Sequence, residues 1–214
     1  MKNFQVRTCV LLVTLAACTP GDQPKRGVQA AADSQAANIR AVVAAGGVVD
    51  SILPIAEHLR RFRATAGERP DTLRHASPTA KLLLDRWARA LSARDTTALN
   101  QMLLDRAEFA WLYYPDAKMS KPPYEAPPGL LWGQLLASSN TGVHKLLNKF
   151  GGASLSIRSF TCPRAAEIEG DNRLHEGCIV RLKAGQSSVA PNRFFGTIIE
   201  RNERFKFIGY ANRL

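Results

Sequence analysis

Residues 194–210 read Phe194-Phe-Gly-Thr-Ile-Ile-Glu-Arg-Asn-Glu-Arg-Phe-Lys-Phe-Ile-Gly-Tyr210. Apolar and polar residues alternate on both sides of Asn202-Glu203, and a period of two is typical of β-strands. Asn tolerates a positive φ at the first position of a tight turn, although the preferred Gly is absent from the second. We therefore predict an antiparallel hairpin at this end of the chain.

Two segments upstream of this hairpin show the same alternation. They carry Leu155 and Ile157 in the first, and Cys178, Val180 and Leu182 in the second. Each segment is long enough for a strand of ordinary length. We predict that both are strands, with a polar loop between them.

Before residue 152 the apolar residues repeat with the period of a helix. Ser77 and Pro78 predict the N-cap and first position of one helix, and Asp95 predicts the cap of a shorter one. Asp105–Tyr114 extends that helix or forms a strand. Pro128 opens a third helix, and Gly151 is expected to stop the last helical repeat. The predicted buried faces are Leu84, Trp87, Ala88 and Leu91 in the first helix, and Val143, Leu146, Leu147 and Phe150 in the last.

Helices followed by a run of antiparallel strands predict an α+β domain. Two stretches resemble the nuclear transport factor 2-like superfamily: the hairpin above, and Leu84-Asp-Arg-Trp-Ala-Arg-Ala-Leu-Ser-Ala-Arg-Asp-Thr-Thr-Ala-Leu99. The second is similar to that family's opening helix pair. The resemblance implies N-terminal helices packed against a curved, cone-like antiparallel sheet whose mouth often holds a small ligand. No catalytic motif of the family carries over.

The first 17 residues have the order of an export signal. Lys2 and Arg7 precede an apolar run over residues 9–17, which is shorter than the ~20 residues that span a bilayer. Leu15-Ala-Ala-Cys18 resembles the lipobox of bacterial lipoproteins, which implies that Cys18 becomes the lipidated first residue. The alternative is an ordinary secretory signal with an incidental cysteine.

These features predict an exported protein that a lipid anchors in the cell envelope. Because Thr19 and not Asp follows the cysteine, the resemblance implies the periplasmic face of the outer membrane in an organism that has one. We expect a signal peptide at 1–17, a lipidated tether at 18–36, a helical segment at 37–76 and the α+β domain at 77–214.

The chain is strongly basic, and removal of Lys2 and Arg7 with the signal lowers its net charge from +11 to +9. Export makes nucleic acid an unsuitable partner. Anionic lipid, cell-wall polymer or another envelope protein fits a tethered basic domain better. A basic surface with no specific partner is the alternative.

Cysteine usage agrees with export. Cys9 leaves with the signal and Cys18 takes the lipid, which leaves Cys162 and Cys178 as a pair. An even pair in an oxidising compartment predicts a disulfide. No Cys-x-x-Cys or His-x₃-His spacing supports a metal site, and no cofactor motif is present.

An aromatic segment is the candidate ligand pocket, because rings give apolar walls and Tyr or Trp adds a polar group. Glu108 beside it is a candidate general base if buried, or else a solvated carboxylate paired with Arg106. The alternative for the rings is ordinary core packing. The residues are Phe109, Trp111, Tyr113, Tyr114, Tyr124 and Trp132.

A basic amphipathic helix is the second candidate site. Asp50 or Ser51 is its expected cap, and it runs to about Thr65 with Ile55, Leu59 and Phe62 on one stripe. Arg60, Arg61 and Arg63 occupy the other faces, where they would contact membrane or a partner protein.

Two functions follow from these sites. One is a binding module for a small or anionic ligand in the envelope, and the other is an interaction or assembly lipoprotein that uses the basic helix. No Gly-x-Ser-x-Gly elbow or phosphate loop occurs, so a hydrolase or isomerase with its site in the cone mouth is the weaker alternative.

Overall fold

The computed structural model describes residues 34, 37–38, 40–41, 44–45, 53–212 and 214. The chain divides into two units, residues 1–52 and 53–214. In the first unit, residues 34, 37–38, 40–41 and 44 are helical. The export signal, Cys18 and the expected caps Asp50 and Ser51 lie outside the described residues.

In the second unit, helices precede strands. The helical elements are α2 (Ile55–Ala64), α3 (Ala80–Ser92), α4 (Thr96–Gln101), α5 (Arg106–Glu108), the π-helix η1 (Phe109–Tyr113), the 3₁₀ turn η2 (Lys118–Ser120) and α6 (Pro128–Phe150). The strands are β1 (Leu155–Thr161), β2 (Glu167–Glu169), β3 (Asn172–His175), β4 (Ile179–Ala184), β5 (Ser187–Asn192), β6 (Ile198–Arg201) and β7 (Arg204–Phe207). This order confirms the α+β class.

The strands form two antiparallel sheets where the sequence analysis predicted one curved sheet. The three-stranded sheet has the order β1-β4-β5, and the four-stranded sheet has the order β2-β3-β6-β7. The predicted hairpin is β6–β7, with Arg201 opposite Arg204. Its turn residues Asn202 and Glu203 have φ angles of 49° and 57°. Positive φ at both positions is what a type I′ turn requires.

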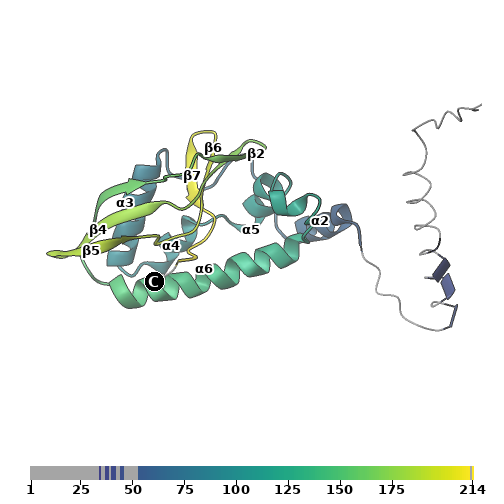
Figure 1. The fold of residues 1–214 in the computed structure, drawn as a ribbon, viewed down its shortest axis with the longest axis horizontal. Coiled ribbons are helices and arrows are strands. Elements are labelled where there is room, and N and C mark those ends of the chain that lie inside the picture. Colours follow the sequence, from purple (N-terminus) through teal and green to yellow (C-terminus); the bar gives the residue numbers. More distant parts are fainter. Residues whose placement is uncertain (1–33, 35–36, 39, 42–43, 46–52, 213) are drawn as a thin grey trace, which may run out of the picture. The chain divides into compact units, whose positions relative to one another are not determined.

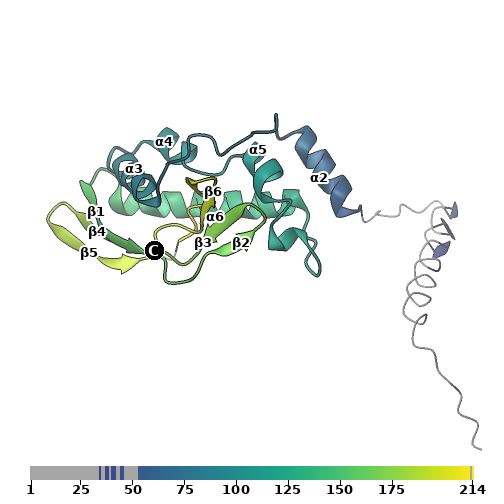
Figure 2. The ribbon, with the colours of Figure 1, turned by 90° about the horizontal axis from the view of Figure 1, so that it is seen from above.

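Two apolar clusters fill the domain, and α6 contributes to both. Leu146 and Phe150 belong to the cluster around Trp87. Leu131 and Trp132 pack against the cluster around Phe109. Figures 1 and 2 show α6 running along the whole domain, from the α2 end to the three-stranded sheet. The predicted two helical repeats are therefore one helix of 23 residues.

The predicted face of α3 is confirmed. Leu84, Trp87, Ala88 and Leu91 are all buried. The Trp87 ring lies 6.0 Å from that of Phe194 and 5.9 Å from that of Phe195. Aromatic pairs at these centroid distances stabilise a core beyond the area that they bury. The two stretches that suggested the fold thus pack directly on each other.

Gly142 allows α6 to cross the chain that follows β7. A Cβ atom at this position would stand 1.8 Å from the backbone oxygen of Tyr210. The Asn212 side chain donates a hydrogen bond to the Gly142 oxygen at 3.0 Å, and the Ser139 hydroxyl accepts one from the Tyr210 N–H at 3.0 Å. Only glycine fits this approach of two backbones.

Several helix ends differ from the prediction. The N-cap of α3 is Thr79, whose hydroxyl accepts from Leu82 N–H at 3.1 Å, while Ser77 is buried and pairs with Phe205 of β7. Helix α2 begins at Ile55 because Pro54 occupies the cap position. The glycine with positive φ after α6 is Gly152, one residue beyond the predicted stop. The cap of α4 is Asp95, as predicted.

The predicted polar loop between Cys162 and Cys178 is wrong, because it contains the hairpin β2–β3. Gly170 makes the turn with a φ of 60°, and Glu169 pairs with Asn172. Strand β3 then pairs with β6, so the hairpin belongs to the four-stranded sheet. Strand β5 was also missed, since its sequence Ser-Ser-Val-Ala-Pro-Asn lacks a strong apolar alternation.

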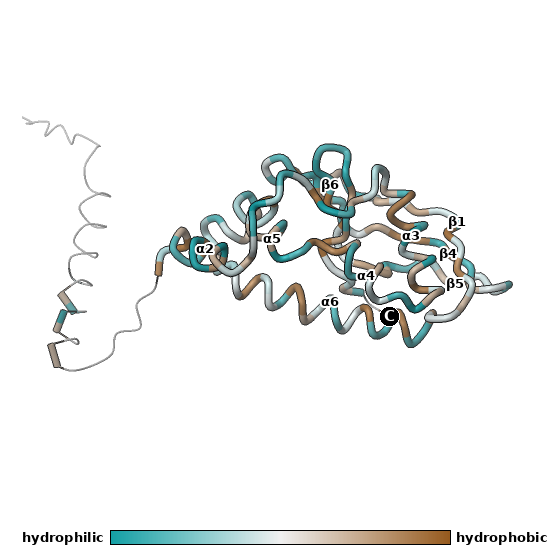
Figure 3. Tube along the Cα trace, turned by 180° about the vertical axis from the view of Figure 1, so that it is seen from behind, coloured by the Kyte–Doolittle hydropathy of each residue, from teal (hydrophilic) through white to brown (hydrophobic). Residues whose placement is uncertain are grey.

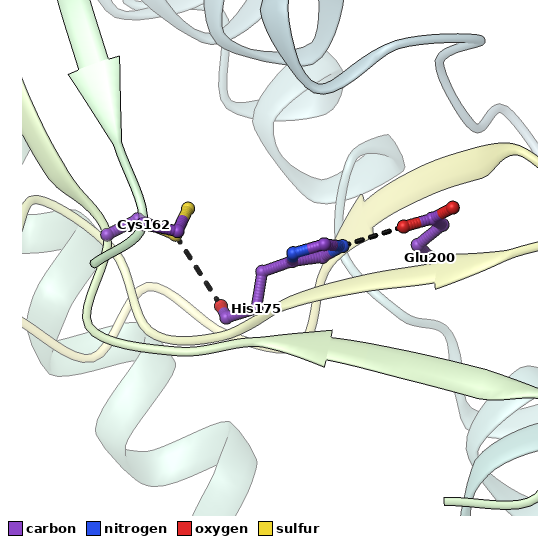
Figure 4. The surroundings of a disulfide bond; sticks show 4 residues. Cys162, His175 and Glu200 are labelled. Atoms are coloured by element: carbon purple, nitrogen blue, oxygen red, sulfur yellow. Dashed lines mark hydrogen bonds and ion pairs between the residues drawn. A yellow bond between two sulfur atoms is a disulfide. The ribbon is translucent and has the colours of Figure 1, made fainter. Parts of the chain in front are cut away.

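The predicted disulfide is present between Cys162 and Cys178, whose Cα atoms lie 4.0 Å apart. Thr161 and Ile179, the neighbouring residues, are opposite each other in β1 and β4. Figure 4 shows the bond beside His175, whose backbone oxygen lies 3.6 Å from the Cys178 sulfur. The chain passes from one sheet to the other on each side of this bond. The bond therefore closes the base of the β2–β3 hairpin.

Reduction of this disulfide should lower the free energy of unfolding by about 3 kcal/mol, the entropic value for a loop of ~15 residues. The measurement is chemical unfolding of the oxidised protein with and without reductant, and of the Cys162→Ala/Cys178→Ala variant. The oxidised wild type in the same denaturant is the control. An unchanged unfolding midpoint after complete reduction would contradict a stabilising bond.

Candidate functional site

An open apolar pocket of about 220 Å³ lies between η1, η2 and the first half of α6. Apolar side chains dominate its wall, and its polar groups come from Tyr113, Gln134 and Ser138. The lining residues are Phe109, Tyr113, Met119, Leu131, Gln134, Leu135 and Ser138. None of them is charged, so the pocket suits an uncharged and partly apolar group.

The π-helical geometry of η1 shapes one wall of this pocket. Tyr114 N–H donates to the Phe109 oxygen at 2.8 Å, five residues back. A single π turn inside helical structure is uncommon and frequently occurs at functional sites. Phe109 at its start and Tyr113 at its end both line the pocket, with ring centroids 5.8 Å apart.

Tyr113 lines the pocket, and its phenol lies near the carboxylates of Glu167, Glu169 and Glu176. In the described part of the chain its hydroxyl has no hydrogen-bond partner. Burial raises the pKa of this phenol, and the nearby carboxylate of Glu169 adds to the shift. The hydroxyl therefore keeps its proton at neutral pH and can donate it in a hydrogen bond. Ser138 differs, because its hydroxyl donates to the Gln134 and Leu135 oxygens of α6.

The structure brings only part of the predicted aromatic cluster to the pocket. The ring centroid of Trp132 lies 5.2 Å from that of Phe109, but Trp132 does not line the pocket. Tyr114 is buried and donates to the Ala126 oxygen at 2.7 Å, which holds the Pro-rich loop. Tyr124 is 52% exposed on that loop. Core packing, the alternative interpretation, thus holds for Tyr114 and Trp132.

Trp111 lies on the side of η1 that contacts α2. The guanidinium of Arg63 stands 4.0 Å from its ring centroid, and the same group donates to the Ala110 oxygen at 3.1 Å. This stacking is a cation–π contact. Burial lowers the pKa of Arg63. Arg63 therefore attaches α2 to η1, whereas the sequence analysis placed it on a membrane or partner surface.

The other two arginines of α2 are exposed and bound within the helix. Arg60 and Arg61 each donate to Glu57 at 2.7 Å. These bonds lower the pKa of Glu57 to about 2. The predicted apolar stripe faces inward, since Phe62 is buried and Ile55 and Leu59 pack against the same cluster. No unpartnered apolar stripe remains on α2.

Glu108 is fully buried, but it does not line the pocket. Its carboxylate accepts from Lys206 Nζ at 2.7 Å and from Asp105 N–H at 2.7 Å, and it also accepts from Arg74 N–H. The Asp105 bond completes a capping box at the start of α5. Lys206 is the partner, where the sequence analysis considered Arg106. A carboxylate with these three donors has a structural role.

Lys206 is 1% exposed, and its ammonium is as buried as its partner. Burial lowers the pKa of Lys206, while the adjacent Glu108 carboxylate opposes that shift. The alternation Phe205-Lys206-Phe207 predicts a solvent-facing lysine, so the sequence carries no signal for the burial of Lys206.

Glu169 is a second carboxylate that the sequence did not single out. One oxygen accepts from Lys118 N–H at 2.8 Å, and the other is buried with no hydrogen-bond partner in the described chain. Burial raises the pKa of Glu169. It links β2 to η2, and so it positions the loop that carries Met119.

A second pocket, of about 360 Å³, lies near the disulfide. Its polar lining residues are Arg164, Glu176, Arg193, Thr197 and Asn212. Arg164 pairs with Glu176 at 3.6 Å. Arg193 has no acidic partner among the described residues, but it is exposed. The lining therefore carries one net positive charge, on an exposed arginine that water screens.

Metal and catalytic arrangements are not found in the described part of the chain. No group of three metal-ligating side chains occurs within residues 53–212. His175 bonds to Glu200 at 2.7 Å, and no nucleophile stands with them. No described helix is both long and apolar enough to cross a bilayer. Comparisons with family models, curated proteins and solved structures find nothing similar to this chain.

Removal of one partner of the buried pair should be strongly destabilising. Lys206→Met leaves the Glu108 carboxylate buried without its counter-ion, which costs about 3–5 kcal/mol of unfolding free energy. Glu108→Gln combined with Lys206→Met removes both charges and should recover part of that loss. Chemical unfolding measures both variants.

Lys81→Met is the matched control. It breaks the exposed Lys81–Asp85 pair, whose atoms lie 2.8 Å apart, and should cost at most about 1 kcal/mol. Equal effects of Lys81→Met and Lys206→Met would show that burial of the Glu108–Lys206 pair has no energetic consequence.

Proposed function

We propose that this chain is a cell-envelope lipoprotein whose folded domain binds a small, partly apolar ligand in the pocket between η1, η2 and α6. The observation that carries the ligand-binding proposal is the uncharged aromatic pocket with the free hydroxyl of Tyr113. The order of charges, apolar run and Cys18 in the first 18 residues supports the lipid anchor.

The pocket limits the size and chemistry of the ligand. Its volume of about 220 Å³ is below the ~300–1,000 Å³ of sites that enclose a whole drug-sized molecule. The bound part is therefore a single ring or a short acyl segment, with the rest of the ligand exposed. A hydrogen-bond acceptor on that part would pair with Tyr113, and Gln134 offers both donor and acceptor groups.

Binding explains the pocket better than catalysis does. Its lining contains no His, Asp, Glu, Cys or Lys that would serve as a general base or activated nucleophile. The Ser138 hydroxyl already donates within α6. Glu108, the general base that the sequence suggested, lies elsewhere and is neutralised by Lys206.

The anchor is tested by Cys18→Ser. Because lipid transfer to the thiol precedes cleavage in the lipoproteins that Leu15-Ala-Ala-Cys18 resembles, this variant should accumulate as unprocessed precursor. Mass spectrometry of the wild-type N-terminus should show an acylated Cys18. Cys9→Ser is the matched control and should be processed normally. A wild-type mature protein without an acyl mass would refute the anchor.

The pocket is tested by filling it. Ser138→Trp places a ring into the pocket, whereas Asn140→Trp adds the same ring to an exposed position of α6 that does not line it. With the neutral probe N-phenyl-1-naphthylamine, Ser138→Trp should weaken binding at least fivefold, and Asn140→Trp should leave it unchanged. Fluorescence titration measures the dissociation constants.

Native mass spectrometry of protein taken from its own envelope gives a second measurement. A bound small molecule should be present in wild type and in Asn140→Trp, and absent in Ser138→Trp. Equal probe binding by all three proteins would show that this pocket is not the ligand site.

A further inference from the structure

Exposed large apolar side chains gather at one end of the domain. Six such residues occur in the described chain, and four of them lie between residues 119 and 136. They are Met119, Tyr124, Leu130 and Leu136, with exposed fractions of 42%, 52%, 54% and 42%. In Figure 3 hydrophobic positions recur along α6 toward the α2 end. We call Met119, Tyr124 and Leu130 the apolar tip.

The loop that presents the apolar tip is held in place by hydrogen bonds. Ala126 N–H donates to the Met119 oxygen at 2.8 Å, and the Ser120 hydroxyl donates to the Ala117 oxygen at 2.7 Å. The hydroxyl of the buried Tyr114 donates a hydrogen bond to the backbone oxygen of Ala126. The exposure of Met119 and Tyr124 is thus a fixed feature of the fold.

The polar surroundings of the apolar tip suit a lipid headgroup layer. Lys118 and Lys121 flank Met119 in sequence, and both are exposed. Lys118 Nζ lies 3.9 Å from a Glu167 oxygen, and the exposed Glu125 follows Tyr124. The Asp116 carboxyl is half-buried and lies against Gly170 in the exposed turn of the β2–β3 hairpin. From Pro128 to Val143 helix α6 carries no charged residue. Tyrosine beside lysines is the composition of protein segments at membrane interfaces.

The chain enters the domain at the same end. Helix α2 contacts both η1 and α6. Figures 1 and 2 agree that α2, α5 and the start of α6 lie together, with α3 and the three-stranded sheet at the opposite end. A chain that comes from an anchor at Cys18 therefore reaches the domain beside the apolar tip.

We propose that the apolar tip lies on the anionic bilayer surface in which Cys18 is anchored, with Met119, Tyr124 and Leu130 among the upper acyl chains and Lys118 and Lys121 at the headgroups. The inference rests on the proposed lipid anchor. It assigns the membrane contact to the Pro-rich loop and the start of α6, and not to the arginines of α2. The anchor keeps the domain at high local concentration near lipid, so a weak contact suffices to orient it.

Quenching by brominated lipid tests this orientation. The lipidated mature protein, with its acyl mass confirmed, is reconstituted on vesicles of phosphatidylethanolamine and phosphatidylglycerol with or without bromine on the acyl chains. Tyr124→Trp should lose at least half of its added fluorescence in brominated vesicles. Leu82→Trp, at an exposed apolar position of α3, is the matched control and should lose no more than wild type.

Met119→Trp gives the same measurement at a second position, should Tyr124→Trp fold poorly. Absence of extra quenching at both positions overturns the proposal. If Tyr124→Ser instead dissociates a dimer seen by sedimentation, the apolar tip is covered by a second copy of the chain, and the proposal is equally overturned. Absence of an acyl mass on Cys18, or unaltered probe binding by Ser138→Trp, would contradict the proposed function. The quenching result is distinguishable from both, because it is measured only on protein whose acyl mass is confirmed.

Discussion

The ion pair between Glu108 and Lys206 connects the helical and sheet parts of the domain. Glu108 caps α5 by accepting from Asp105, and it accepts from Arg74 in the segment before α3. Lys206 comes from β7, far along the chain. A buried carboxylate is stable only when paired and hydrogen-bonded, so these segments must meet in one arrangement. Phe109 follows Glu108 directly, and the π turn that shapes the pocket therefore begins from a fixed point.

The disulfide imposes a second constraint, on how the two sheets join. The chain leaves the three-stranded sheet after β1, forms β2 and β3 in the other sheet, and returns as β4. The Cys162–Cys178 bond fastens both passages. Glu169 of the same hairpin then binds Lys118 N–H, which fixes η2 over the pocket. A covalent bond distant from the pocket thus helps to position Met119, one of its walls.

The features that the sequence predicted correctly depend on local or pairwise signals. The turn at Asn202-Glu203, the cap at Asp95 and the buried face around Trp87 each follow from a few neighbouring residues. The disulfide followed from counting cysteines. The hairpin β2–β3 was missed because charged residues fill it, and its strands are stabilised by pairing with β6 and not by their own apolar pattern. Thr79 replaced Ser77 as a cap because β7 engages Ser77.

Only part of the candidate site could be predicted from the sequence, for the same reason. The aromatic residues of η1 were visible, but their division between core and pocket depends on the i→i−5 bond at Tyr114 and on the return of the loop over α6. The sequence predicted a surface cation at Arg63, whereas the Arg63 guanidinium stacks on Trp111. The sequence of the helix that begins at Pro128 gives no indication that a pocket lies beside Leu131 and Leu135.

Met119 belongs to both the pocket and the apolar tip, and this shared residue connects the two proposals. If the tip rests on the bilayer, the pocket wall that Met119 forms stands next to the acyl chains. A ligand with a short apolar part would partition into that layer and need little further desolvation to reach Phe109 and Leu135. The absence of charge from the pocket lining is suited to such a ligand, since a charged group would remain at the headgroups. The proposed lipid anchor would then place the pocket where its ligand is most concentrated.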